Sequence, residues 1–421
     1  MGGGDTQRVG RVGIVGAGMV GLCTAWSLQA HGVEVTVFDR EGVAAGASWG
    51  NAGWLTPGMA VPLPEPAVLR YGVRALISPN SPVYVPPTTD TMLMRFLLQF
   101  ARNCTMPRWR QAMQGLIPLN NRAFEAFDAL VDAGIPSPVR PAEPFIAAYR
   151  TEADREVLLE EYRHVLAAGQ KIEFDRLTGA QARDLEPALS EAVTAALLIH
   201  GQRFLDPADF VVALGEQVRD RGGTLRTERV EAVGADGTGA LINGEHFDAV
   251  VIASGAHLGQ LAEPFGVRTI VQAGRGYSFT VECEHLPAGP VYFPTQRLAC
   301  TPLTNGRLRV AGMMEFRPVD TPLDPRRIQA LVLAGNDLLA GANLHERQDE
   351  WVGARPVTPD GLPVIGRTRA PSVYVAGGHG MWGMLLGPIT GQLLADYVVT
   401  GREPAELAHV NPLRNTPGWR R

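Results

Sequence analysis

Cysteine is scarce in this chain. The 421 residues include four cysteines, which are far apart and form no Cys-x-x-Cys pair: Cys23, Cys104, Cys283 and Cys300. This spacing argues against a metal site and against a framework of disulfides, and it suits a reducing compartment. We therefore expect no bound metal and a cytoplasmic location.

The chain also lacks a cluster of positively charged residues. Its 38 Lys and Arg residues are scattered and are outnumbered by 43 Asp and Glu residues, which leaves a formal net charge of −5. A protein that binds nucleic acid needs clustered positive charge to neutralise phosphates. Nucleic acid is therefore excluded from the expected partners.

Long hydrophobic runs are missing as well, since none reaches the roughly 18 residues that a membrane-spanning helix needs. The nearest approach, residues 92–100, is interrupted by Arg95 and Gln99. Its apolar residues form one helical stripe, which predicts a face packed on a core. The alternative is a surface for a partner or a membrane, with the protein bound peripherally at the inner face of the cell membrane.

The length of 421 residues predicts two or three domains with room to bury a large ligand. Residues 1–8 contain no apolar core of a signal peptide, and we expect a disordered tail there.

A glycine-rich turn near the start is the first informative stretch. Residues 12–15 read as a short apolar strand, and three glycines follow at the Gly-x-Gly-x-x-Gly spacing. The first glycine permits a tight turn, the second lets the backbone approach a pyrophosphate, and the third lets the next helix, residues 20–31, pack on the strand. That helix aims its free N–H groups at the phosphates. The predicted phosphate-binding residues are Gly16, Ala17, Gly18, Met19, Val20 and Gly21.

The residues after this helix strengthen the prediction. Residues 33–38 alternate like a second strand, which ends at Asp39 and Arg40. An acidic residue about 20 positions after the glycines is placed to accept hydrogen bonds from ribose hydroxyls. Both residues are expected to contact the cofactor, and the alternative is an ordinary βαβ unit with a solvated Asp39.

A glycine-rich loop with two tryptophans follows at residues 46–54. Its glycines admit close backbone approach to a flat ring, and its small polar side chains offer hydrogen bonds to phosphate or ring heteroatoms. The alternative is a surface loop, although exposed tryptophans are costly. The expected cofactor contacts are Ser48, Asn51, Ala52 and Gly53.

The middle of the chain predicts a substrate layer. An irregular, proline-rich crossing segment at residues 57–87 leads to three helical patterns, at 91–102, 109–133 and 152–168. Strands are expected at residues 145–149 and 196–200.

The dinucleotide-binding pattern then resumes. A helix at residues 210–221, capped by Asp206, precedes strands at 224–233 and 248–253, and the second strand runs into small residues. The expected cofactor contacts here are Val230, Ala253, Ser254 and Gly255. An antiparallel sheet is expected between residues 270 and 347, together with a helix at 325–340.

The far end of the chain contains a second strand, glycine turn and helix. A strand at residues 373–376 opens into the turn, and a helix follows at 389–400. A simple nicotinamide enzyme has no need of this second unit. The expected cofactor contacts in it are Gly378, His379, Gly380, Met381, Trp382, Gly383 and Met384.

With both ends considered, the sequence resembles the D-amino-acid dehydrogenase and glycine oxidase family of FAD-dependent, D-amino-acid-oxidase-like flavoproteins. Five motifs carry the resemblance: Gly16-Ala17-Gly18-Met19-Val20-Gly21, Ser48-Trp49-Gly50-Asn51-Ala52-Gly53, Gly276-Tyr277-Ser278, Arg355-Pro356-x-Thr358-Pro359-Asp360-Gly361-x-Pro363 and Gly378-His379-Gly380.

The resemblance implies an α/β plus α+β fold, with a Rossmann-like FAD-binding domain and a discontinuous mixed-sheet substrate domain over the flavin ring. The FAD-binding domain is expected at residues 9–90, 200–270 and 348–421. The substrate-binding domain is expected at residues 91–199 and 271–347. The FAD is expected to be noncovalent, because no cysteine shortly precedes Thr358 as in covalently flavinylated relatives.

Three residues are expected to act at the substrate. The resemblance implies that Arg355 binds a substrate carboxylate, and a guanidinium fork suits that task because it holds a carboxylate bidentately. It places the Tyr277 phenol at the substrate end of the pocket, and His379 beside the flavin or the substrate. The alternatives are an ion pair for Arg355, a surface hydroxyl for Tyr277 and a structural hydrogen bond for His379.

The expected activity is oxidation of the C–N bond of a D-amino acid, glycine or a secondary amino acid, with hydride passing to flavin N5. The imine that results hydrolyses to a 2-oxo acid and ammonia or an amine, and oxygen or a quinone reoxidises the flavin. Residues 381–386 are bulkier than expected for a D-alanine type of enzyme, so the substrate side chain stays open. An FAD-dependent 2-hydroxy-acid dehydrogenase and a non-catalytic FAD-binding protein are the alternatives.

Overall fold

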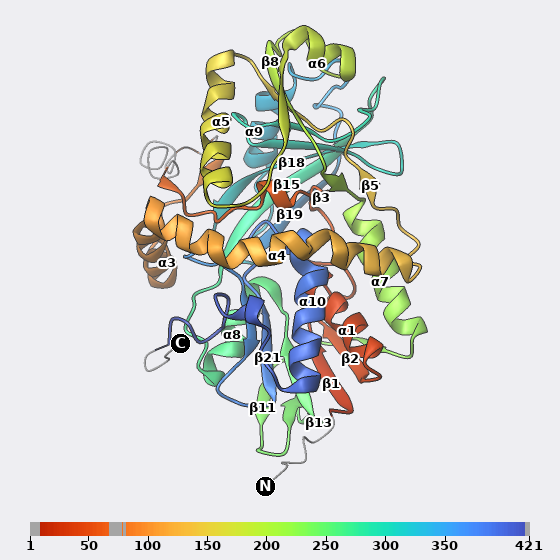
Figure 1. Ribbon diagram of the computed structural model, residues 1–421, viewed down its shortest axis with the longest axis vertical. Coiled ribbons are helices and arrows are strands. Elements are labelled where there is room, and N and C mark those ends of the chain that lie inside the picture. The colour runs from red at the N-terminus through yellow and green to blue at the C-terminus, as the bar shows by residue number, and fades with distance from the viewer. Residues whose placement is uncertain (1–8, 67–77, 79–80, 417–421) are drawn as a thin grey trace.

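A six-stranded sheet forms the lower body of the computed structural model, which describes residues 9–66, 78 and 81–416 (Figure 1). Five strands run parallel, and β20 alone is antiparallel to its neighbour. Their Val- and Ile-rich stretches are buried because both faces of a parallel sheet are covered. In spatial order the strands are β10 (Thr224–Thr227), β2 (Glu34–Asp39), β1 (Arg11–Val15), β14 (Ala249–Ile252), β21 (Val373–Gly377) and β20 (Val364–Arg367).

Helices cover one face of this sheet and a small sheet covers the other. The helices α1 (Met19–Ala30), α7 (Pro207–Asp220) and α10 (Gly383–Thr400) share one apolar cluster with the strands. The opposite face packs against α8 (Leu258–Ala262) and a three-stranded sheet. That small sheet consists of β11 (Val233–Ala235), β12 (Ala240–Ile242) and β13 (Glu245–Phe247).

A nine-stranded mixed sheet forms the upper body (Figure 1). Most neighbours are antiparallel, and the pairs β16 with β6 and β18 with β4 are parallel. In order the strands are β19 (Gln348–Val357), β15 (Gln272–Val281), β18 (Leu308–Phe316), β17 (Leu298–Pro302), β16 (Val291–Phe293), β6 (Ile146–Tyr149), β8 (Ala195–Ile199) and β7 (Phe174–Thr178), with β4 (Val83–Tyr84) beside β18.

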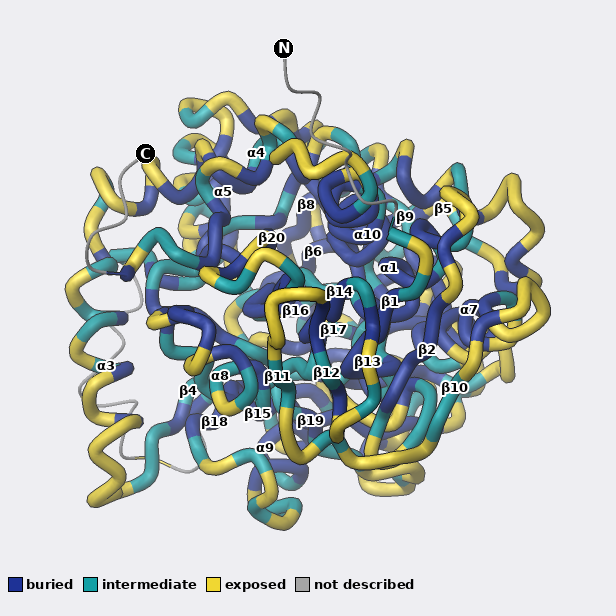
Figure 2. The backbone as a smooth tube through the Cα atoms, turned by 90° about the horizontal axis from the view of Figure 1, so that it is seen from below, coloured by how far each residue is buried: buried dark blue, intermediate teal, exposed yellow. Residues whose placement is uncertain are grey.

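Different helices pack on the two faces of the mixed sheet. The helices α9 (Pro325–Gly335) and α6 (Gly179–Leu185) pack on one face, and α5 (Glu152–Ala167) packs on the other. A short sheet of β3 (Trp54–Leu55), β9 (Arg203–Phe204) and β5 (Arg140–Pro141) lies nearby. Helix α3 (Thr91–Asn103) closes a separate apolar cluster at the edge of the molecule (Figure 2).

The long helix α4 (Met106–Asp132) connects the two bodies and crosses between them in Figure 1. Its Trp109 and Met113 belong to the cluster under α5, whereas Leu116, Leu119 and Ala123 belong to the cluster around α1 and α10. Helix α4 therefore packs against both bodies.

Several elements differ from the sequence-based expectation. The strand expected at 224–233 ends at Thr227, because residues 228–232 form a connection to the separate sheet that begins at β11. Helix α10 begins at Gly383 rather than at 389, since Pro388 lies inside it and interrupts the pattern. Residues 348–357, expected in the FAD-binding domain, form β19 of the mixed sheet, where they pair with β15.

Two expectations concern residues outside the described part of the chain. The disordered tail expected at residues 1–8 lies wholly outside it, and the crossing segment at 57–87 lies partly outside it.

Candidate active site

The carboxyl ends of four parallel strands meet at one edge of the six-stranded sheet. Gly16 follows β1, Asp39 ends β2, Ala253 follows β14 and Gly378 follows β21. Ligands of open α/β sheets bind outside such an edge. The fold therefore brings together residues that the sequence separates by more than 300 positions.

The first glycine turn has the close contacts that its spacing predicts. Gly16 has a φ of +114°, and a Cβ atom on it would lie 2.4 Å from the Ala253 carbonyl oxygen. A Cβ atom on Gly21 would lie 1.9 Å from the Gly16 carbonyl oxygen. At Gly18 the single described atom within 4 Å would be Ser48 Oγ, at 3.3 Å. This side of the turn is open to an approaching pyrophosphate.

Asp39 joins the second strand to this turn. Its carboxylate accepts hydrogen bonds from the backbone N–H groups of Ala17 at 2.9 Å, Glu41 at 2.9 Å and Gly42 at 3.1 Å. Its neighbour Arg40 forms ion pairs with Glu41 at 2.9 Å and with Asp320 at 3.4 Å. These hydrogen bonds from Asp39 therefore stabilise the turn, whether or not Asp39 also contacts the cofactor.

The loop at residues 46–54 lies between the two bodies. Ser48 Oγ accepts a hydrogen bond from the N–H of Met19 at 3.2 Å, and Asn51 accepts one from Gly53 of its own loop at 2.8 Å. Thr301 of β17 donates to the Ala52 carbonyl at 2.7 Å. The loop thus bonds to the glycine turn on one side and to the mixed sheet on the other.

An unsatisfied hydroxyl lies after β14. Within the described chain, the buried Oγ of Ser254 has no hydrogen-bond partner. Its neighbour Gly255 has a φ of +57°, and Val230 packs on the apolar cluster beneath this edge. Because buried polar groups are rarely left unpaired, Ser254 is suited to a ligand atom.

The second glycine turn is fixed to β19. Gly378 and Gly380 have φ values of +70° and +57°, and the N–H of Gly380 donates to the Pro356 carbonyl at 2.8 Å. Two turn residues beyond it, Met381 and Trp382, lead into α10, and Trp382 Nε1 donates to the Val61 carbonyl at 2.8 Å. The turn therefore lies beside β19 close to Arg355, where His379 pairs with Val357, two residues beyond Arg355.

His379 is buried in this turn, with an exposed fraction of 3%. Its Nε2 lies 3.0 Å from Thr390 Oγ1, and its Nδ1 has no partner among the described residues. Burial lowers the pKa of His379 to about 4, because the interior disfavours the charged ring. The imidazole is therefore neutral at physiological pH, with one nitrogen free.

Arg355 is a cation without a carboxylate partner. Its Nη1 donates to the Met313 carbonyl at 2.7 Å, and it forms no ion pair with any residue that the structure describes. A Cβ atom on Gly276 would lie 2.2 Å from Arg355 Cζ, so the guanidinium lies directly over that glycine. Burial lowers the pKa of Arg355 to about 10, which leaves it charged at neutral pH.

Small residues surround Arg355 on its face of the mixed sheet. Gly276 pairs with Gly353, Ser278 pairs with Ala311, and Ala311 pairs with Ala299. Paired residues and next-but-one neighbours share a face of a sheet, so these side chains lie on one side. The result is a flat floor beside an available guanidinium.

Tyr277 does not lie on this floor. Its side chain is fully buried among residues of the α9 side, and its hydroxyl donates to Glu315 Oε2 at 2.5 Å. The phenol lies on the opposite face from Arg355, because successive residues of a strand point to opposite faces, and its role at the substrate stays a prediction. Gly276, and not Tyr277, is on the side of Arg355.

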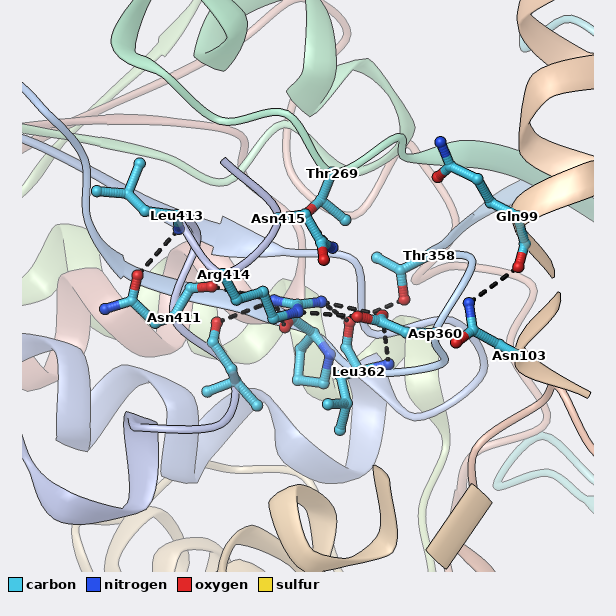
Figure 3. A network of polar contacts seen from close by, with 12 residues as sticks. Gln99, Asn103, Thr269, Thr358, Asp360, Leu362, Asn411, Leu413, Arg414 and Asn415 are labelled. Carbon is cyan, nitrogen blue, oxygen red and sulfur yellow. Dashed lines mark hydrogen bonds and ion pairs between the residues drawn. The ribbon is translucent and has the colours of Figure 1, made fainter. Parts of the chain in front are cut away.

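A half-buried ion pair was not anticipated from the sequence (Figure 3). Arg414 donates to both carboxylate oxygens of Asp360, at 2.9 Å and 3.0 Å, and to the carbonyls of Leu362 and Pro363. Asp360 belongs to the segment between Arg355 and β20. No sequence pattern joins these residues, which are 54 positions apart.

The Rossmann-like edge and the two glycine turns define the class of dinucleotide-dependent oxidoreductases. The chain belongs to the family described as FAD dependent oxidoreductase (DAO), whose model matches residues 11–397.

Individual relatives agree with this assignment. A D-amino acid dehydrogenase of Cereibacter sphaeroides is 31% identical over 408 residues, which cover 94% of this chain and 92% of that protein. A D-amino acid dehydrogenase of Xylella fastidiosa is 31% identical over 402 residues, covering 92% of each. The expected family is confirmed.

Solved structures share the fold. Glycine oxidase from Geobacillus kaustophilus superposes with a TM-score of 0.75 at 23% identity, covering 96% of this chain and 99% of that one. Iminodiacetate oxidase from Chelativorans sp. BNC1 gives 0.69 at 20% identity, covering 96% and 99%. The expected fold class is confirmed, and FAD is the cofactor of the family.

The residues present fit that cofactor. The cradle at Gly16 and Gly21 admits no Cβ atom, Gly18 is open, and the Ser254 hydroxyl is unpaired within the described chain. The N-terminus of α1 adds N–H groups that have no partner within the helix.

Proposed function

We propose that the protein oxidises the C–N bond of an amino acid whose carboxylate is bound by Arg355. The observation that carries the proposal is a charged guanidinium without a carboxylate partner, lying over Gly276 on a floor of small residues. The product is an imine, which water converts to a 2-oxo acid and ammonia or an amine. The relatives named as D-amino acid dehydrogenases support this reaction.

The residues that hold FAD in this proposal come from five segments. Residues 16–21 and the start of α1 face the pyrophosphate, Asp39 and Arg40 lie towards the ribose, and the turn at 253–255 offers the Ser254 hydroxyl. The loop at 48–53 and the turn at 378–384 would hold the ring. FAD supplies the acceptor for two electrons and a proton.

Arg355 orients the substrate in this proposal. A bidentate pair with the carboxylate fixes the direction of the bond between the α-carbon and its hydrogen. The neutral His379 leaves the site without a second positive charge from the turn, and its free Nδ1 offers a hydrogen bond. The N-terminal end of α10 favours negative charge on the reduced cofactor.

The test is anaerobic reduction of the purified yellow protein by glycine, D-amino acids, L-amino acids and N-substituted amino acids. We expect the flavin absorbance to bleach with at least one of them, with release of ammonia or an amine. Bleaching by 2-hydroxy acids alone, without ammonia, would identify a 2-hydroxy-acid dehydrogenase. A flavin that no compound in the panel reduces would contradict the enzymatic proposal.

We also propose that α3 brings the protein to a membrane surface, where a quinone is the electron acceptor in place of oxygen. Met94 and Leu98 are each 55% exposed on its outer side, and Arg95 and Arg102 flank them. Among the described residues no helix is long and apolar enough to cross a bilayer. Interfacial helices combine apolar and basic residues in this way.

Sedimentation with anionic vesicles tests this surface. The double substitution Met94→Glu and Leu98→Glu should abolish binding, whereas Leu333→Glu, at a 66% exposed position of α9, should not. Equal sedimentation of both variants would contradict a role for α3.

A further inference from the structure

A cavity of about 1310 Å³ lies between α3, the start of α4, α8 and the C-terminal segment. Its described lining includes none of the residues assigned above to FAD or to the substrate. In Figure 3, Gln99 and Asn103 of α3 lie on one side of this region, and Thr269 and Asp360 lie on the other. Cavities that bind small ligands have volumes of about 300–1,000 Å³. This cavity is therefore large enough for a further ligand.

Positive charge reaches the cavity from one side of α3 and from the start of α4. Arg95, Gln99 and Arg102 are four and three residues apart, so they line the cavity from the same side of α3. Arg108 lies in the first turn of α4, and its Nη1 donates to Asn103 Oδ1 at 3.0 Å. This hydrogen bond holds Arg108 against the end of α3, beside Arg102.

These arginines lack the acidic partners that the other charged residues of the cavity have. Among residues 9–66, 78 and 81–416, Arg95 and Arg102 form no ion pair, and the one partner of Arg108 is the neutral Asn103. The corner between α3 and α4 therefore has an excess of positive charge, which favours an anionic ligand. Each carboxylate in the described lining is already engaged: Asp90 with the N–H groups of Met92 and Leu93, Glu263 with Arg268, Asp320 with Arg40, and Asp360 with Arg414.

The N-terminus of α4 favours an anion at the same corner. Thr105 precedes this helix without a side-chain hydrogen bond to it, and Arg108 and Gln111 of its first two turns line the cavity. The first N–H groups of a helix have no partner within the helix, and they form the positive end of its dipole. This positive end lies at the corner where Arg102 and Arg108 meet.

The outer side of α3 indicates the kind of anion. Met92 lines the cavity and is 52% exposed, and Met94 and Leu98 are each 55% exposed on the outer side. Because successive residues of a helix are turned by about 100°, Arg95 and Arg102 lie between this apolar side and the rest of the cavity lining. A phosphate that carries acyl chains fits both the cations and the apolar side, as in other interfacial basic sites.

We propose that this cavity binds the headgroup of an anionic phospholipid. Arg102 and Arg108 hold the phosphate at the corner between α3 and α4, and Arg95 adds a further positive charge. The acyl chains leave over Met92 into the membrane. The inference rests on the proposed membrane surface of α3 and is independent of the amino-acid reaction. It goes beyond that surface, because binding in a cavity is saturable and depends on residues that the outer side of α3 does not contain.

Titration of the FAD-loaded protein with dihexanoylphosphatidylglycerol, a soluble anionic phospholipid, tests the cavity without a membrane. Calorimetry should show saturable binding at least about tenfold tighter than that of the zwitterionic dihexanoylphosphatidylcholine, and tighter by as much than that of glycerol 3-phosphate, which has no acyl chains. The double substitution Arg102→Gln and Arg108→Gln should weaken binding of the anionic lipid about tenfold or more. Arg110→Gln is the matched control, because Arg110 is exposed on α4 outside the cavity lining. An unchanged flavin spectrum shows that each variant is folded.

Equal affinities for the two lipids would overturn the inference. Equal affinities for the anionic lipid and glycerol 3-phosphate would also overturn it, because the ligand would then be a soluble phosphate ester. Vesicle sedimentation separates the inference from the surface on which it rests. A protein that sediments with vesicles but does not bind the soluble lipid would overturn the inference and leave the surface of α3 intact. Binding of the soluble lipid without sedimentation would support the cavity and overturn the surface.

Discussion

The guanidinium of Arg355 is available to a ligand because of the small residues beside it. A side chain on Gly276 would collide with its guanidinium, and Gly353 beside it leaves room for the ring of Trp351. The desolvated charge is retained because the backbone carbonyl of Met313 accepts one of its hydrogen bonds. Such a group gains more from an incoming carboxylate than an exposed arginine does.

Replacing Arg355 by Ala should therefore lower kcat/KM by about 10- to 100-fold, since charge-assisted hydrogen bonds are each worth about 1.5–3 kcal/mol. Most of the loss should be a higher KM for the amino acid. Arg307→Ala removes an exposed arginine that pairs with Asp349, and it should leave both constants within about twofold. Steady-state kinetics of the two variants measures this, and an unchanged KM in Arg355→Ala would remove its assigned role.

His379 makes the stability of the protein depend on pH. Its folded-state pKa of about 4 lies below the usual histidine value of about 6.5, so the unfolded chain binds the proton more readily. Its contribution to stability is complete above about pH 6.5 and is lost as the pH falls towards 4. The free energy of unfolding should fall by up to about 1.4 kcal/mol per pH unit in that window.

Urea unfolding of the unsubstituted protein and of His379→Gln between pH 4 and 7.5 isolates this effect. The difference between the two curves should change across the window, because Gln does not titrate. Parallel curves would show that His379 is not the titrating group.

At the scale of elements, the contact of α1 with β1 fixes the first glycine turn. A methyl group on Gly21 would collide with the Gly16 carbonyl, which belongs to the backbone and cannot rotate away. Gly21→Ala should therefore weaken FAD binding by at least about tenfold, as α1 is pushed from the strand. Gly259→Ala in α8 has no atom within 4 Å of the added carbon and should retain the cofactor. Flavin fluorescence titration of the apoproteins compares them.

The segment between β19 and β20 is held by the C-terminal residues. Thr358 packs on Gly378 of the second turn, and Arg414 binds Asp360 in the same segment (Figure 3). Because the pair is partly exposed, breaking it should cost less than the about 3–5 kcal/mol of a fully buried pair. Arg414→Met should lower the thermal midpoint and raise the KM for the amino acid more than Arg402→Met, an exposed residue between α10 and Arg414. Equal thermal midpoints and equal KM values for the two variants would contradict this role.

At the scale of the whole molecule, local patterns predicted most elements but not how they combine. The spacing of Gly16, Gly18 and Gly21 indicated the first turn, and apolar periodicity gave α3, α4 and α5 to within about three residues. The motif around Tyr277 was recognised, but it did not indicate on which face of the strand the phenol lies. Which face is buried depends on α9, which lies almost 50 residues further along the chain.

The ion pair of Arg414 and Asp360 arises from long-range packing, because it joins segments that no periodicity or spacing relates. Residues 348–357 read as an extension of the motif that follows them, whereas their ten-residue strand gains more hydrogen bonds as an edge partner of β15. Which segments pair is decided by competition between whole elements, and a local sequence pattern carries no information about that competition.

The position of β21 in the six-stranded sheet has a consequence for synthesis of the protein. This strand lies between β14 and β20, and α10, which follows it, covers α1. A ribosome that has made residues 9–360 has produced the first glycine turn, but the sheet still lacks two strands and the apolar side of α1 is still bare. We therefore expect the nascent chain to need chaperone protection until β20, β21 and α10 have emerged, and to acquire its flavin only after that.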